Sequence, residues 1–196
     1  QRDQAGETLA AAKAELAGIE REHAALERDR AARAKRAGAQ SQPAAIDSVR
    51  AAPGYERALA AVLGRDANAL LGKAQAGDGR FWTGAESPAP VAGSLAEHVL
   101  RCPDELKARL ALVHVCDADD GRALAPGHWL VTRDGLLRRW DGFVASGEGG
   151  AEAARLEAEN RFAELDAQLP ALRAALNAAQ QAEQSAQLEL TALRTE

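Results

Sequence analysis

The chain is poor in several residue types on which large enzymes and secreted domains depend. Its 196 residues include no Met, two Cys and only 4% aromatic residues, so alanine carries much of the 46% hydrophobic content. Alanine favours helices but buries little area, which excludes a large aromatic core over most of the length. Two cysteines do not make a disulfide scaffold, and they favour a reducing, intracellular setting.

Membrane and catalytic signals are also missing from the sequence. The apolar runs are too short to span a bilayer, and no secretory signal opens the chain. Neither a G-x-x-x-x-G-K-[ST] phosphate loop nor a G-x-S-x-G nucleophile turn occurs. Because the chain starts at Gln1 and lacks Met, we expect an internal fragment of a longer protein. We predict that it is cytoplasmic and non-catalytic, with no cofactor and no membrane partner.

The last 45 residues have the clearest periodicity. Apolar residues recur there with alternating spacings of three and four, and nine of ten such seam positions are apolar. This 3.5-residue repeat predicts a coiled-coil helix whose seam needs a partner. The ten positions are Phe162, Leu165, Leu169, Leu172, Leu176, Ala179, Glu183, Ala186, Leu190 and Leu193. Pro170 follows a seam leucine, and we expect it to kink this helix rather than end it.

The N-terminal segment repeats the spacing less regularly before Gly38 and Pro43 end it. Its seam positions are Leu9, Ala12, Leu16, Ile19, His23, Leu26, Arg30 and Arg33. Two such helices can satisfy each other by folding back antiparallel. We therefore predict an N-terminal coiled-coil helix over 1–40, a folded domain over 41–150 and a returning coiled-coil helix over 151–196.

The middle segment mixes helix, strand and turn signals, which is typical of an α+β domain. A helix is predicted over 53–64, and the capping-box pattern of 94–97 predicts a second short helix that ends before Pro103. Residues 110–116 read as a buried strand, and 129–140 read as a β-hairpin that turns at Asp-Gly. The predicted fold is an α+β lobe inserted between two long helices that form an intramolecular antiparallel coiled coil.

Glycines follow the predicted hairpin beside large apolar side chains. They are either an ordinary linker or positions where the backbone of another chain approaches closely. Aromatic residues next to glycines at the end of a hairpin favour an edge strand that pairs between subunits. We therefore predict a homodimer whose interface contains Trp140, Gly142, Phe143 and Gly147.

The local charge of one segment differs from the charge of the whole chain. A formal net charge of −5 argues against a protein that coats nucleic acid by charge alone. Residues 28–36 nevertheless hold five basic residues against one acid, which gives a local charge of +4. A concentrated patch of this kind predicts weak, salt-sensitive DNA binding. The predicted DNA contacts are Arg28, Arg30, Arg33, Lys35 and Arg36, with Arg138 and Arg139 of the hairpin as further candidates.

The basic segment also has a second interpretation. Its arginines can form a solvated helix end that pairs with acids of the returning helix, namely Glu152, Glu157 and Glu159. Arg30 and Arg33 stand at seam positions, where an unpaired guanidinium is costly, so without such pairs the two helices should splay. The sequence leaves both interpretations open.

Four side chains of the middle segment are candidate metal ligands. His98 and Cys102 share one face of the second predicted helix, and His114 and Cys116 share one face of the predicted strand. Their spacing matches no common zinc motif, and cysteine and histidine often occur as half-buried structural groups. A structural coiled-coil protein with a metal-dependent clasp is the alternative function that this set supports.

Four sequence motifs, in order and between the two predicted coils, resemble the hinge region of bacterial structural-maintenance-of-chromosomes (SMC) proteins, in particular the alphaproteobacterial branch. They are Gly54-Tyr55-Glu56-Arg57-Ala58-Leu59 with Leu63-Gly64, then Leu95-Ala96-Glu97-His98-Val99, then Pro126-Gly127 with Leu130-Val131-Thr132 and Asp134-Gly135, and last Arg139-Trp140-Asp141-Gly142-Phe143. The resemblance covers essentially the whole chain.

The resemblance implies a function in chromosome condensation and segregation, as in a condensin. A hinge of this family homodimerises through two glycine-flanked interfaces and contacts DNA through basic residues near the junction with the coil. The family also implies ATPase heads and kleisin-type partners, both of which would belong to parts of the protein outside this segment.

Overall fold

The computed structural model describes residues 2–38, 42–74 and 79–195, and it divides the chain into two compact units. The arm unit comprises Gln1–Ala32 and Arg161–Glu196, and the lobe unit comprises Arg33–Asn160. Two long helices, α1 (Arg2–Ala37) and α5 (Gly150–Thr195), contribute residues to both units. The predicted boundary at 40/41 lies outside the described residues.

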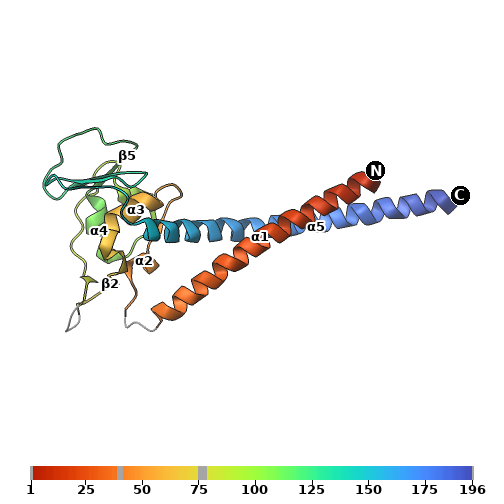
Figure 1. The fold of residues 1–196 in the computed structure, drawn as a ribbon, viewed down its shortest axis with the longest axis horizontal. Helices are drawn as coiled ribbons and strands as arrows, with labels where there is room; N and C mark the ends of the chain where they lie inside the picture. The colour runs from red at the N-terminus through yellow and green to blue at the C-terminus, as the bar shows by residue number, and fades with distance from the viewer. Residues whose placement is uncertain (1, 39–41, 75–78, 196) are drawn as a thin grey trace. The chain divides into compact units, whose positions relative to one another are not determined.

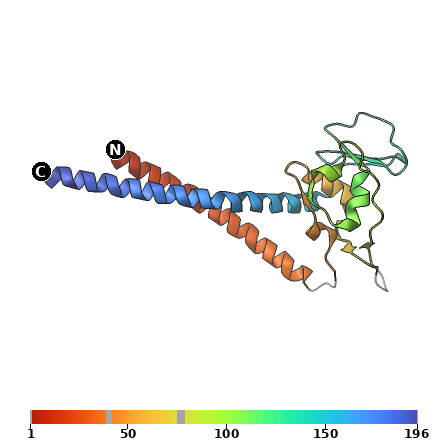
Figure 2. The ribbon, with the colours of Figure 1, turned by 180° about the vertical axis from the view of Figure 1, so that it is seen from behind.

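In the arm unit the two helices run antiparallel (Figures 1 and 2). Ion pairs join Glu22 to Arg161 at 2.7 Å and Glu20 to Arg173 at 3.0 Å. Lower residue numbers on α1 therefore face higher residue numbers on α5, as an antiparallel pair requires. Every predicted seam position of this unit is buried or half-buried except Arg30 and Leu193. The coiled-coil prediction is therefore confirmed.

Helix α5 continues through Pro170, which confirms the prediction that this proline does not end the helix. The ring of Pro170 lies on the exposed side, directly after the buried seam residue Leu169. Within the described part of the chain, no helix combines the length and the hydropathy that a membrane span requires.

The first half of the lobe unit is built from short elements. They are α2 (Ala45–Ser48), β1 (Arg50–Ala51), α3 (Glu56–Leu63), the 3-10 helix η1 (Gly64–Asn68), β2 (Leu70–Leu71), β3 (Phe81–Trp82), the 3-10 helix η2 (Leu95–His98), β4 (Val99–Arg101) and α4 (Asp104–Ala111). Strand β1 pairs antiparallel with β4, and β2 pairs parallel with β3. Helix α3 begins three residues later than the helix predicted over 53–64, and it ends at the expected Gly64 cap.

The second half is a four-stranded sheet in the order β5–β6–β7–β8. Its strands are β5 (Val113–Cys116), β6 (Trp129–Thr132), β7 (Leu137–Arg139) and β8 (Val144–Ala145). Strand β5 is parallel to β6, whereas β6, β7 and β8 form an antiparallel meander. The hairpin predicted over 129–140 is present, and β8 forms one edge of the sheet.

The helix predicted from the capping box is wrong. Residues 95–98 form a single 3-10 turn, and 99–101 form strand β4. Neither bond of the box is made: the Ser94 N–H donates to the Val91 carbonyl at 3.1 Å, and the Glu97 carboxylate accepts the Gly93 N–H at 3.1 Å instead. The buried Ser94 hydroxyl has no partner among the described residues. Pairing of β4 with β1 overrides the local helix signal, and Pro103 instead precedes the first turn of α4.

One hydrophobic core joins the two halves of the lobe unit. Leu59 of α3, Leu95 of η2 and Leu106 of α4 are fully buried in it. The core also includes Ala153 and Leu156, which lie beyond the boundary predicted at 150/151. The first turns of α5 are thus packed as part of the lobe unit.

Candidate functional site

An exposed apolar surface lies at the β8 edge of the four-stranded sheet. Trp140 is 48% exposed, Phe143 46% and Val144 55%, and we call these three residues the edge patch. Register places Val144 beside Arg138 of β7, so the other side of β8 is the open edge of the sheet. Large apolar side chains at an open strand edge are unusual on a protein that works as a monomer.

Two glycines that flank the edge patch have left-handed backbone conformations. Gly142 has φ +87°, and its N–H donates to the Arg139 carbonyl at 3.1 Å in the turn between β7 and β8. Gly147, with φ +73°, follows β8. A Cβ added at either glycine would meet no atom within 4 Å, so both positions leave space beside the backbone.

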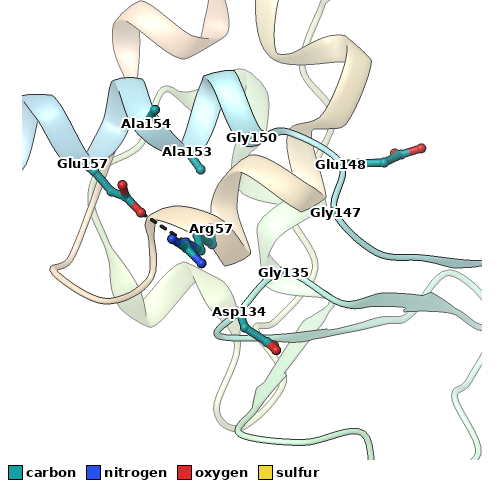
Figure 3. Close-up of a pocket in the computed structure, with 9 residues that line it drawn as sticks. All are labelled: Arg57, Asp134, Gly135, Gly147, Glu148, Gly150, Ala153, Ala154 and Glu157. Atoms are coloured by element: carbon teal, nitrogen blue, oxygen red, sulfur yellow. Dashed lines mark hydrogen bonds and ion pairs between the residues drawn. The ribbon is translucent and has the colours of Figure 1, made fainter.

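Gly147 also lines a polar cavity of about 260 Å³ (Figure 3). In this cavity the Arg57 guanidinium donates to the Glu157 carboxylate at 3.2 Å. The remaining lining residues are Asp134, Gly135, Glu148, Gly150, Ala153 and Ala154. Three acids against one arginine make the cavity a poor phosphate site.

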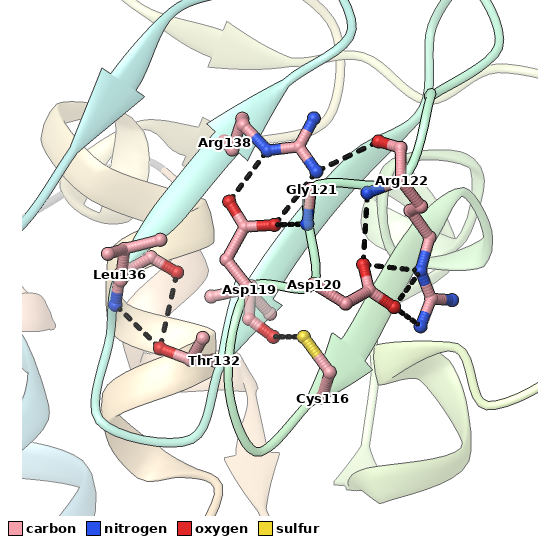
Figure 4. A network of polar contacts seen from close by, with 9 residues as sticks. Cys116, Asp119, Asp120, Gly121, Arg122, Thr132, Leu136 and Arg138 are labelled. Atoms are coloured by element: carbon pink, nitrogen blue, oxygen red, sulfur yellow. Dashed lines mark hydrogen bonds and ion pairs between the residues drawn. The ribbon is translucent and has the colours of Figure 1, made fainter.

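The structure places Arg138 in an internal ion pair. Its guanidinium donates to both carboxylate oxygens of Asp119, at 2.7 and 2.8 Å, and to the Arg122 carbonyl at 2.9 Å (Figure 4). Arg122 in turn pairs with Asp120, and the hydrogen bonds of that pair lower the Asp120 pKa to about 2. Arg138 therefore helps to hold the loop between β5 and β6 on the sheet.

Arg139 is engaged within the lobe unit as well. It pairs with the Asp141 carboxylate at 2.5 Å, and its guanidinium carbon lies 5.4 Å from the centre of the Trp129 ring and 5.3 Å from that of Phe143. Both hairpin arginines thus have partners in the lobe unit.

The basic segment lies entirely on helix α1. Arg33 pairs with Glu159 at 3.1 Å, as one of the two interpretations proposed, and Arg30 lies 4.2 Å over the Phe162 ring. Arg28, Lys35 and Arg36 are exposed. Of the three acids considered as partners, Glu157 pairs with Arg57 of the lobe instead of with α1.

The premise that His98 and Cys102 share a helix face is wrong, because β4 lies between them. The His98 ring stacks on Tyr55, with ring centres 3.9 Å apart and an angle of 5° between the planes. Two of the motifs that resemble the hinge family are thereby in contact. Cys102 is half-buried, and burial raises the pKa of its thiol.

The other two candidate metal ligands lie on β5. His114 Nε2 is 3.0 Å from Nδ1 of His128, and the Cys116 thiol donates to the Val131 carbonyl at 3.8 Å. The pairing with His128 was not predicted from the sequence. Among the residues that the structure describes, no three His, Cys, Asp or Glu side chains are arranged to hold a metal ion.

A buried carboxylate connects α3 to α5. Glu56 accepts the Gly54 N–H at 2.7 Å and the Asn160 side-chain amide at 2.6 Å. That amide also donates to the Ala51 carbonyl, and the Asn160 oxygen accepts from Arg50. This network was not predicted either, although Glu56 belongs to one of the four motifs. Only the fold brings together residues that are 104 positions apart.

No model of a known protein family matches the chain. It is 38% identical over 138 residues to the chromosome partition protein Smc of Rhodopseudomonas palustris, covering 65% of this chain and 12% of that protein. It is 34% identical over 153 residues to the Smc protein of Cereibacter sphaeroides, covering 72% of this chain and 13% of that protein. The crystal structure of an asymmetric dimer of the Geobacillus stearothermophilus SMC hinge domain superposes with a TM-score of 0.55 at 16% identity, covering 92% of this chain and 98% of that one.

The chain has the fold of an SMC hinge domain with adjoining coiled coil. The resemblance that the four motifs indicated is confirmed, and so is the α+β lobe between two long helices. The chain spans about an eighth of the length of the curated Smc relatives that it matches.

Proposed function

We propose that this chain is the homodimerisation hinge of a bacterial SMC chromosome-partition protein, which joins two coiled-coil arms at their tips. The observation that carries the proposal is the edge patch on the open side of β8. The sequence similarity to Smc proteins and the dimer described for the Geobacillus hinge support it.

The chemistry of the edge patch suits a contact between copies. An unpaired strand edge presents backbone donors and acceptors to a second chain, and aromatic residues bury large areas at interface centres. Gly142 and Gly147 leave open space next to this edge, which permits close backbone approach. The interface that we propose contains Trp140, Gly142, Phe143 and Gly147.

Sedimentation of a Phe143→Asp variant tests the dimer. A buried charge at the interface should weaken association by roughly tenfold or more, because the partner aromatic surface cannot solvate it. The matched control is Leu188→Asp, which places the same charge at a 72% exposed leucine of α5. We expect a wild-type dimer at micromolar concentration, with circular dichroism unchanged in both variants. A monomeric wild-type chain, or equal dissociation constants for the two variants, would contradict the proposal.

We propose DNA as a second partner, bound weakly through helix α1. Arg28, Lys35 and Arg36 support this because their side chains are exposed, and helix geometry puts residues seven apart on one face. Arg30 and Arg33 stand between them on the same helix. Attraction to phosphates by a few such charges is independent of base sequence and falls as salt rises.

Neutralising Arg28, Lys35 and Arg36 together to glutamine tests the DNA interaction. The slope of log affinity against log salt should become shallower by about 0.9 for each duplex phosphate that the variant no longer neutralises. The control neutralises Lys13, Arg21 and Arg194, which are exposed on the same two long helices, so the net charge is identical. An equal decrease in affinity in both variants would show a general charge effect and no DNA site at residues 28–36.

In the whole protein, ATPase heads and kleisin-type partners would act at the far ends of the arms, in the cytoplasm on the nucleoid. The hinge would then contribute mechanical closure and no catalysis.

A further inference from the structure

Arg109 of α4 is half-buried and has no counter-charge among the residues that the structure describes. The Arg109 guanidinium lies 4.1 Å over the Trp129 ring, and no carboxylate among the described residues pairs with it. Burial, and then the nearby Arg139, lower the Arg109 pKa. A cation held out of water beside a second cation is destabilised unless an anion joins it.

The second cation has an incomplete set of partners. The Nε–H of Arg139 is buried and donates to no acceptor that the structure describes, while the only carboxylate paired with its guanidinium is Asp141. Two guanidiniums therefore lie near the Trp129 ring, and among the described residues one carboxylate, that of Asp141, pairs with one of them. Among the described residues, the positive charge of Arg109 is therefore unbalanced and the buried Nε–H of Arg139 has no acceptor.

This arginine pair continues into the edge patch. The Arg139 N–H donates to the Phe143 carbonyl at 2.8 Å, and the Arg139 side chain also lies over the Phe143 ring. The surrounding segment 41–150 holds 12 basic and 14 acidic residues, a net charge of −2. A cationic spot on an acidic lobe is complementary to the surface of a second lobe, and arginine and tryptophan are typical of interface centres.

We infer that Arg109 and Arg139 bind a carboxylate of a second copy of this chain, so that the partner completes the charge balance of the site. This inference rests on the proposed homodimerisation. It adds a specific ion pair to the proposed interface. A guanidinium donates two parallel hydrogen bonds to a carboxylate in a fixed geometry, and this geometry would fix how the two lobes are aligned. A phosphate of DNA is the other anion that suits the site.

The first test is an Arg109→Gln variant, compared with Lys107→Gln. Lys107 lies on the same helix and pairs only with exposed Asp104 among the described residues, so its replacement removes one charge without touching the site. We expect Arg109→Gln to weaken the dimer by tenfold or more and to flatten the salt dependence of dimer dissociation, while the control stays within twofold of wild type. Equal dissociation constants in the two variants would overturn the inference.

The second test identifies the carboxylate. Arg109→Lys places an amine in the site, and a zero-length carbodiimide joins an amine to a carboxylate that touches it with loss of one water. In mixed ¹⁴N and ¹⁵N chains, we expect a cross-link from position 109 to an Asp or Glu of the other isotope. The link between Lys107 and Asp104 within one chain reports that the reagent has worked. Its presence without any cross-link between chains at position 109 would overturn the inference even if a glutamine variant failed to fold.

The outcomes separate the inference from the proposed function. A wild-type chain that stays monomeric contradicts both. A wild-type dimer that Arg109→Gln leaves intact contradicts only the carboxylate site. If Arg109→Gln lowers DNA affinity and leaves the dimer unchanged, the anion is a phosphate and the inference is wrong.

Discussion

At the scale of single residues, His114 of β5 and His128, which directly precedes β6, link the lobe unit to solution pH. His114 and His128 share one hydrogen bond between ring nitrogens, which two neutral imidazoles satisfy with one donor and one acceptor. Burial, His128 and Arg122, in that order, lower the pKa of His114 below its ordinary value of 6.5. The folded chain therefore binds this proton less readily than the unfolded chain does.

A lowered histidine pKa makes stability fall with acid. Well above pH 6.5 His114 is neutral in both states. As pH falls toward 6.5 and below, the unfolded state gains the proton first, so the free energy of unfolding decreases. We expect His114→Gln to show a smaller decrease between about pH 7.5 and 5.5. Urea unfolding across that range measures it, and His128→Gln should also reduce the decrease because it removes one cause. An unchanged pH dependence in His114→Gln would contradict the assignment.

At the scale of elements, α3 and the start of α5 approach each other at a glycine. A Cβ at Gly149 would lie 2.8 Å from the Ala60 carbonyl oxygen and 2.9 Å from its carbon, both backbone atoms that cannot move aside. Gly149 also has φ +74°, almost the same as Gly147 two residues earlier. The two glycines therefore separate the cost of backbone conformation from the cost of a steric clash.

We expect alanine to cost more at Gly149 than at Gly147. Gly147→Ala should lower the unfolding free energy by about 1 kcal/mol because of its left-handed backbone. Gly149→Ala should lower it by about 3 kcal/mol, since the clash with α3 adds an overpacking cost. Both are measured by urea unfolding in a Phe143→Asp background, so that association does not contribute. Similar decreases at the two positions would show that α3 and α5 are not in close contact at Gly149.

The long elements could be predicted from sequence because their signals repeat. Seam residues recur over several turns of α1 and α5, and Asp134-Gly135 marks the hairpin between β6 and β7. Shorter elements carry too little pattern: β1, β2 and β3 have two residues each. The Ser94–Glu97 pattern failed because strand pairing with β1 outweighed it.

Part of the candidate site could also be predicted from the sequence. Aromatic and glycine residues after the hairpin identified the segment that the structure exposes at the β8 edge. The partners of Arg138 and Arg139 were not predictable, since Asp119 lies 19 residues from Arg138 and faces it only after the loop folds onto the sheet. The position of Arg109 over Trp129 depends likewise on α4 packing against β6.

At the scale of the whole molecule, the proposed DNA binding depends on the proposed dimer, because the dimer sets how many basic segments one particle carries. A homodimer carries two copies of the basic segment of α1, whereas a monomer carries one. When both copies reach one DNA molecule, the second binding event is intramolecular, and the overall affinity exceeds that of a single weak site. Dimerisation through the edge patch would then control DNA binding without a direct contact between the edge patch and DNA.

Breaking the dimer should therefore weaken binding to long DNA and spare binding to short DNA. We expect Phe143→Asp to lower affinity for a duplex of several hundred base pairs by roughly tenfold or more, with little change for a duplex of about 15 base pairs that holds one segment. Fluorescence anisotropy and filter binding at one salt concentration measure the two affinities. The Arg28, Lys35 and Arg36 glutamine variant is the reference, because it should lower both. If Phe143→Asp lowered both equally, the edge patch itself would bind DNA, and if it lowered neither, each copy of the basic segment would bind DNA independently of its twin.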